Sequence, residues 1–131
     1  MTLQAGGLIT DHTLHAIASY CPLLESLEVD CSLMEFSDEV VAQLLTACTK
    51  LSSLQLCGAA VRDSTLQLIG QHGVSVKKVS LWRCDSVTDA GLLAVVSGIA
   101  RLDSLHIAGG EGVTQAGVME CRKRCVVQKS M

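Results

Sequence analysis

The sequence contains few aromatic residues: one Trp, one Tyr and one Phe among 131 residues, or 2% of the chain. Since 49% of the residues are hydrophobic, we expect a core of aliphatic side chains, which suits layers that repeat one shape. The scarcity of aromatics and the net charge of −3 weigh against nucleic-acid binding. At this length we expect a single domain, 1–131.

Long apolar runs are missing as well. None approaches the roughly 18 residues that a membrane-spanning helix needs. The first seven residues also lack the basic start and apolar stretch of a secretory signal. We therefore expect a cytoplasmic protein that does not enter membranes. Its seven cysteines, an odd number, are then expected to be reduced thiols that pack like small hydrophobic side chains.

The sequence shows no constellation typical of an enzyme or a metal site. His12 and His15 lack the further ligands of a structural zinc site. The glycine-rich segment 108–113 has no lysine of the phosphate-loop pattern. Cys57 and His106 are predicted to lie two strands apart, about 10 Å, too far for a paired nucleophile and base. We therefore predict no catalytic activity, no metal and no cofactor.

A repeated apolar pattern is the strongest signal in the chain. Units that begin at Cys21, Cys48, Gly73 and Ile99 each have apolar residues three, six and eight positions later. The starts are 27, 25 and 26 residues apart, within the range of leucine-rich repeats. The pattern predicts four to five units: a partial repeat at 1–20, repeats at 21–47, 48–72, 73–98 and 99–125, and a tail at 126–131.

The second half of each unit predicts a helix. Ser37 and Asp38, like Thr88 and Asp89, stand just before an amphipathic run, where an N-cap side chain accepts hydrogen bonds from the first helical amides. Each unit is thus predicted to contain a strand, a turn, a cap and a helix. The opening segment 7–20 repeats the helical half, and no strand is expected before it.

The third unit resembles a known repeat family. Its segment 79–96 (VSLWRCDSVTDAGLLAVV) has Cys84, Val87 and the Thr-Asp pair in the order of the cysteine-containing leucine-rich repeat. Such repeats are best known from the substrate-binding domains of F-box ubiquitin-ligase adaptors. The resemblance implies an α/β solenoid with short parallel strands on the concave side and helices on the convex side. It also suggests substrate recognition for a ubiquitin ligase, within a longer parent chain or beside a separate subunit.

Strand alternation predicts which side chains line the concave face. We expect strands at 25–30, 52–57, 77–82 and 103–108, with every second side chain buried. The remaining side chains point outward, where repeat solenoids bind partners. The predicted partner-binding residues are Glu28, Asp30, Gln55, Lys78, Ser80, Trp82, Arg83 and His106.

Trp82 is the main candidate for contact with a partner because Trp is common at interface hot spots. The alternative is that its indole folds over its own scaffold. Glu28 and Asp30 are expected to make one end of the face acidic, while Lys78 and Arg83 make its middle basic.

We therefore predict an adaptor or scaffold that docks a protein on its concave face. The alternative is a structural subunit whose ends are buried in a larger assembly, since the chain starts mid-repeat without an obvious polar cap. In that case charges introduced at Leu14 or Val118 would disrupt association. The basic residues of the C-terminal region are expected to form a solvated tail: Arg122, Lys123, Arg124 and Lys129.

Overall fold

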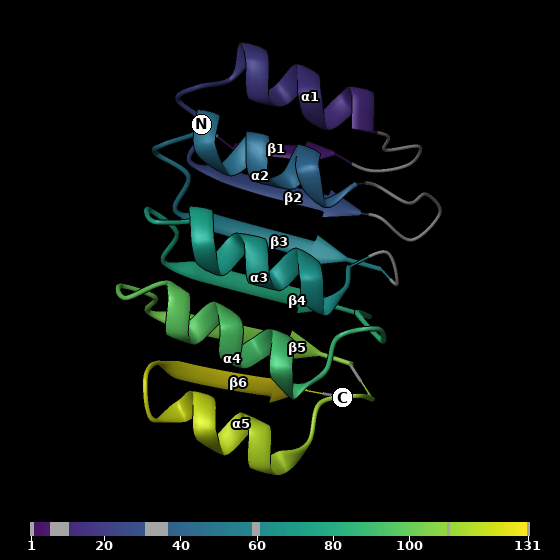
Figure 1. Cartoon of the computed structure of the whole chain (residues 1–131), viewed down its shortest axis with the longest axis vertical. Coiled ribbons are helices and arrows are strands. Elements are labelled where there is room, and N and C mark those ends of the chain that lie inside the picture. Colours follow the sequence, from purple (N-terminus) through teal and green to yellow (C-terminus); the bar gives the residue numbers. More distant parts are fainter. Residues whose placement is uncertain (1, 6–10, 31–36, 59–60, 110, 131) are drawn as a thin grey trace.

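Strands alternate with helices throughout the computed structural model, which describes residues 2–5, 11–30, 37–58, 61–109 and 111–130. Over these residues, six strands form one parallel sheet in chain order, and five helices lie on one face of it (Figure 1). The elements are β1 (Thr2–Ala5), α1 (Asp11–Tyr20), β2 (Ser26–Asp30), α2 (Asp38–Ala47), β3 (Ser53–Cys57), α3 (Asp63–His72), β4 (Lys78–Trp82), α4 (Asp89–Gly98), β5 (Ser104–Ala108), α5 (Gln115–Arg122) and β6 (Val126–Ser130).

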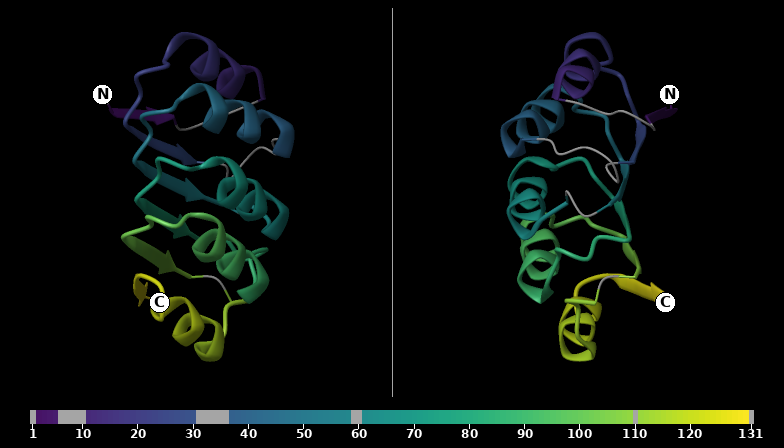
Figure 2. Two further views of the ribbon diagram at one scale, coloured as in Figure 1. Left: turned by 60° about the vertical axis from the view of Figure 1, so that its left-hand side comes forward. Right: turned by 90° about the vertical axis from the view of Figure 1, so that its right-hand side faces the viewer.

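The layers form a single bowed stack. Figure 2 shows the strands along the inner side of the bow and the helices along its outer side. The α/β class and the regular alternation of parallel strand and helix predicted from the sequence are therefore confirmed. This arrangement leaves the inner face of the sheet uncovered by any element of the described chain.

The predicted unit starts coincide with a recurring turn. The four strands predicted from the offsets end at the predicted residues and begin one residue later. In each unit the amide of the residue three positions after the start donates to the carbonyl oxygen of the starting residue. The pairs are Leu24 and Cys21 at 3.2 Å, Leu51 and Cys48 at 3.2 Å, Val76 and Gly73 at 3.0 Å, and Leu102 and Ile99 at 3.3 Å.

The core is aliphatic, as the composition indicates. Every buried hydrophobic residue of the described chain is Leu, Ile, Val or Cys. Helix residues such as Leu66 and Val95 pack against the sheet and are fully buried. The inward side chains of the four central strands are buried as predicted: Leu27, Val29, Leu54, Leu56, Val79, Leu81, Leu105 and Ile107.

Both ends of the sheet differ from the prediction. β1 pairs with β2, with Leu3 in register with Leu27, so the expectation of no strand before the first helix was wrong. β6 pairs with β5, so most of the predicted tail, 126–131, forms the last strand. A terminal strand has a neighbouring strand on one side only. It also belongs to no complete repeat, so the repeat alignment could not predict it. Its pairing depends on the unpaired amides and carbonyls at the edge of the next strand.

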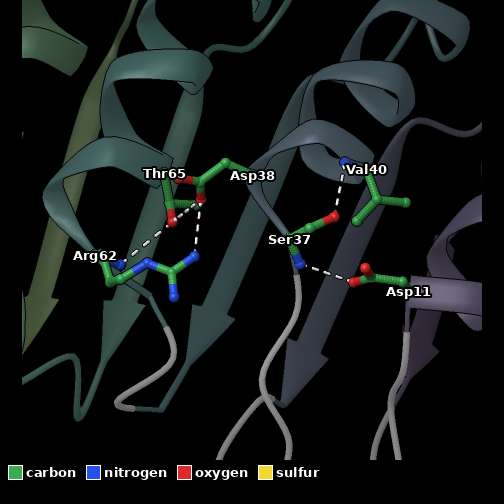
Figure 3. Close-up of polar contacts among 6 residues, drawn as sticks. All are labelled: Asp11, Ser37, Asp38, Val40, Arg62 and Thr65. Atoms are coloured by element: carbon green, nitrogen blue, oxygen red, sulfur yellow. Dashed lines mark hydrogen bonds and ion pairs between the residues drawn. The ribbon is translucent and has the colours of Figure 1, made fainter.

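Ser37 caps α2 as predicted and also joins α2 to the preceding layer. Its Oγ accepts a hydrogen bond from the Val40 amide at 3.4 Å, while its own amide donates to Oδ1 of Asp11 at 2.7 Å (Figure 3). Asp11 is the first residue of α1. Ser37 thus caps α2 through its side chain and links α2 to α1 through its backbone amide.

The same link recurs in the later layers and explains the Thr-Asp pair. Asp63 accepts a hydrogen bond from the Thr88 amide at 2.7 Å, and Asp89 accepts one from the Thr114 amide at 2.8 Å. Each threonine hydroxyl donates to the same aspartate. The expected side-chain cap by Thr88 was wrong, since no amide of α4 donates to its hydroxyl. Donation to an aspartate does not prevent capping, because the Thr114 hydroxyl donates to Asp89 and also accepts a hydrogen bond from the Gly117 amide at 3.2 Å. Each aspartate therefore binds the threonine at the start of the helix in the next repeat.

The link between α2 and α3 is built differently because Arg62 stands where the other units have Ser or Thr. Its guanidinium lies 3.2 Å from Oδ1 of Asp38, which also accepts a hydrogen bond from the Thr65 hydroxyl at 2.9 Å (Figure 3). Partial burial alone would raise the pKa of Asp38. Hydrogen bonds from Ser64, Thr65 and Arg62, together with the Arg62 charge, outweigh it and lower this pKa.

This site predicts an acid-dependent loss of stability. Because the folded-state pKa of Asp38 is lowered, its carboxylate stabilises the fold above the ordinary aspartate value of 3.8, and this contribution disappears as pH falls through the folded pKa. Asp38→Asn should therefore melt below the wild type at pH 7, and the gap should narrow as the pH falls below 3.8. A gap in melting temperature that stayed constant from pH 7 to pH 2.5 would contradict the assignment.

Candidate partner-binding face

The sheet face that points away from the helices, called the open face below, carries the outward side chains of β2 to β5. In contrast to the buried inward side chains, these are half-buried or exposed. Strand register aligns them in three rows across the sheet. The rows are Ser26, Ser53, Lys78 and Ser104; Glu28, Gln55, Ser80 and His106; and Cys57, Trp82 and Ala108.

Register therefore brings most of the predicted site residues onto one continuous surface. Glu28 and Gln55 lie in the middle row, two and one strands from Ser80. Asp30 is the last residue of β2 and is paired with Cys57 in the backbone register, but its side chain lies outside the described residues.

Trp82 is the largest side chain on the open face. It ends β4 and stacks on the His106 ring, with ring centroids 5.1 Å apart and planes inclined by 18°. Register pairs Trp82 with Ala108, and Ser80 with His106, so the stack joins diagonal neighbours on adjacent strands. The indole thus covers part of its own scaffold while Trp82 remains 39% exposed. The sequence left two interpretations open, an indole available to a partner and an indole folded over its own scaffold, and each describes part of this geometry.

Arg83 follows Trp82 in a left-handed backbone conformation. Its φ is 55°, whereas the matching positions after β3 and β5 are Gly58 and Gly109, with φ of 117° and 81°. The Arg83 amide donates to the Ala108 carbonyl oxygen at 2.9 Å, so this turn is tied to the next layer. A side chain in this region costs about 1 kcal/mol or more compared with glycine. The sequence could have predicted this exception, because an alignment of the residues just after the strands shows Arg83 where two other units have glycine.

Positive charge flanks the tryptophan. Lys78 begins β4, about 13 Å along the strand from Trp82, and Arg83 adjoins it. Both Lys78 and Arg83 are exposed, and neither side chain has a hydrogen-bond or ion-pair partner within the described ranges. Glu28 lies two strands away from β4, or about 10 Å. Lys78 and Arg83 are therefore two exposed cations along β4 in a protein of net charge −3.

The cysteines are free thiols wherever the chain is described. Burial raises the pKa of Cys84 to about 12 and that of Cys121 to about 11, so both stay protonated at neutral pH and are poor nucleophiles. Cys48 is buried and its Sγ donates to the Cys21 carbonyl oxygen at 3.2 Å. These thiols fill gaps between layers. Cys57 differs because it is only half-buried and lies on the open face, in register with Trp82.

The two histidines considered as metal ligands lie on the opposite side of the molecule. His12 and His15 are exposed on α1, along a groove shared with Glu39 and Gln43 of α2. The His15 Nδ1 atom lies 3.3 Å from Oε1 of Gln43. No cluster of three or more His, Cys, Asp or Glu side chains suited to a metal ion occurs in the described part of the chain.

The basic residues near the C-terminus are exposed to solvent, as the sequence suggested: Arg122, Lys123, Arg124 and Lys129. They do not form a free tail, because they lie on α5, on β6 and in the turn between them. Arg122 ends α5, and its Nε donates to the Val127 carbonyl oxygen at 3.4 Å. Lys129 lies on β6, and its Nζ donates to the Val113 carbonyl oxygen at 3.2 Å. Lys129 departs from the expected tail for the same reason as the unexpected strand, because the pairing of β6 with β5 places it on the last layer.

Comparison with the known protein families finds no family model that matches the chain. A search of the described helices finds none with both the length and the apolar character needed to cross a membrane.

Proposed function

We propose that this chain is a protein-binding module, an adaptor or scaffold, built from leucine-rich repeats of the cysteine-containing type. The observation that carries the binding role is the open face itself, with a partly exposed Trp82 held on His106 amid polar side chains. A rigid aromatic surrounded by adaptable polar groups is a typical hot-spot arrangement. The repeat type is supported by unit lengths of 25 to 27 residues and by the Thr-Asp pairs that link successive layers.

Two narrower statements belong to the same proposal. A cytoplasmic location is supported by the free thiols of the described cysteines, since reducing compartments keep thiols unpaired. Substrate recognition within a ubiquitin ligase rests on the family resemblance, and the open face would then receive the substrate.

Affinity capture from the native cell tests the binding role. Trp82→Ala should remove the captured partner, because it deletes the largest exposed contact on the open face. It should also lower stability by about 1 kcal/mol, since part of the indole packs on His106. Val74→Ala is the control: Val74 is 77% exposed in the turn after α3 and should change neither capture nor folding.

Cys57 provides an independent readout on the same face. Bound partner should slow the alkylation of Cys57 by iodoacetamide, measured by mass spectrometry, while the half-buried Cys21 in the turn after α1 should react at an unchanged rate. Capture that survives Trp82→Ala and leaves Cys57 unprotected would move the binding role away from the open face.

A further inference from the structure

The charges of the open face indicate which chemistry its partner carries. Lys78 and Arg83 stand at the two ends of a strip along β4, with Trp82 beside Arg83. Both cations are exposed and unpaired within the described chain. An ion pair to an exposed cation contributes little binding free energy by itself. Each cation can still pair with an anion of a partner that is already held close by a neighbouring contact.

We propose, resting on the protein-binding role above, that this strip takes an extended acidic segment of a partner protein. One carboxylate pairs with Lys78 and a second with Arg83, while an apolar side chain between them packs on the exposed part of Trp82. In an extended chain the length of the strip corresponds to two acidic residues four to six positions apart.

Carboxylates fit the strip better than phosphates do. Phosphate recognition in proteins typically uses clustered arginines that share one doubly charged group. Here the strip carries one arginine at one end and lysines at the other, Lys78 with the exposed Lys77 before it, and the two ends are separated by the length of β4. A polyanion such as RNA would also meet the overall net charge of −3, which repels it at long range.

The neighbouring side chains confine the segment to β4 and β5. Glu28 lies about two strands away, where it disfavours an acidic segment displaced toward β2. Ser80 and Ser104 lie beside the strip and offer hydroxyls to the backbone of an extended peptide. The stacked His106 holds the indole in place before binding, which reduces the entropy lost when the peptide docks.

Selection from a random peptide display library tests the proposal on the full chain. Peptides enriched on the wild type, after removal of those that also bind a Lys78→Glu/Arg83→Glu variant, should carry two Asp or Glu residues four to six positions apart with an apolar residue between them. Both substituted side chains are exposed and unpaired within the described chain, so the variant should melt close to the wild type. Lys50→Glu, an exposed lysine in the turn after α2, is the matched charge control.

Affinities of the selected peptides, measured by fluorescence anisotropy, decide between the outcomes. The proposal expects at least a tenfold loss when both acids become Gln, a similar loss on each single charge reversal of Lys78 or Arg83, and no loss on Lys50→Glu. A phosphoserine version that binds more than tenfold tighter than the Glu version would overturn the carboxylate assignment. A selection with no acidic preference, or one that yields no peptide, also overturns it, while Cys57 protection by a captured partner would still support the binding role itself.

Discussion

Gly70→Ala should destabilise the protein by about 2–3 kcal/mol, although the same change within an exposed helix normally stabilises by 0.5–1 kcal/mol. The reversal of sign comes from the contact between α3 and α4. A Cβ atom at Gly70 would overlap the Ala94 carbonyl oxygen and lie 3.2 Å from the Ala94 carbonyl carbon. These are backbone atoms of a packed helix and cannot move aside as the end of a flexible side chain could.

Gly98 gives the same prediction from the other helix. A Cβ at Gly98 would come within 2.7 Å of the Gly70 Cα, so Gly98→Ala should also destabilise. Gln71→Ala is the control because Gln71 is exposed on α3 and both residue types are good helix formers. Thermal melts of the three variants check the prediction. A Gly70→Ala protein that melts at or above the wild-type temperature would show that α3 and α4 do not pack backbone to backbone.

The central layers could be predicted from the sequence because their determinants are local and repeated. The apolar offsets from Cys48 place β3 within one residue and assign Leu54 and Leu56 to the core, and both are buried. Four copies of the pattern reinforce one another, so an error in one unit would conflict with the others. The same reasoning assigns Trp82 to the open face, where it is 39% exposed.

The features that were missed depend on neighbours in space. The stack of Trp82 on His106 requires the exact register of β4 and β5, which sets diagonal neighbours. The bond from the Thr88 amide to Asp63 joins residues 25 positions apart, so the local cap pattern suggests a different partner for Thr88. The terminal strand β6 forms because β5 offers an open edge. Composition and periodicity describe a residue's own unit and do not specify its contacts in the next layer.

For the second candidate function, a subunit whose ends are buried in an assembly, the terminal helices offer exposed apolar side chains. Tyr20 on α1 is 83% exposed and Met119 on α5 is 57% exposed, so each terminal helix presents a large apolar side chain. The positions that the sequence suggested for testing the ends are unsuitable, because Leu14 and Val118 are 2% and 1% exposed. A charge at either one would enter the core.

Val118→Asp should therefore unfold the last layer, at a cost of more than about 4 kcal/mol, because it buries a carboxylate without a partner. A terminal repeat contacts only one neighbouring layer, so the effect should be local. Hydrogen exchange should accelerate in α5 and β6 while α2 and α3 keep their protection. Uniform loss of protection along the chain would instead show that the solenoid unfolds as one cooperative unit.

Met119→Asp, one residue further on, is the matched control and also the correct probe of the ends. Since Met119 is exposed, the substitution should leave hydrogen exchange and the melting temperature unchanged. If the ends of the stack are the working surface, Met119→Asp should abolish association in sedimentation or capture experiments, and Trp82→Ala should not. If the open face is the working surface, the two variants should behave in the opposite way. The pair of variants thus separates the two candidate functions without relying on a protein that has lost its fold.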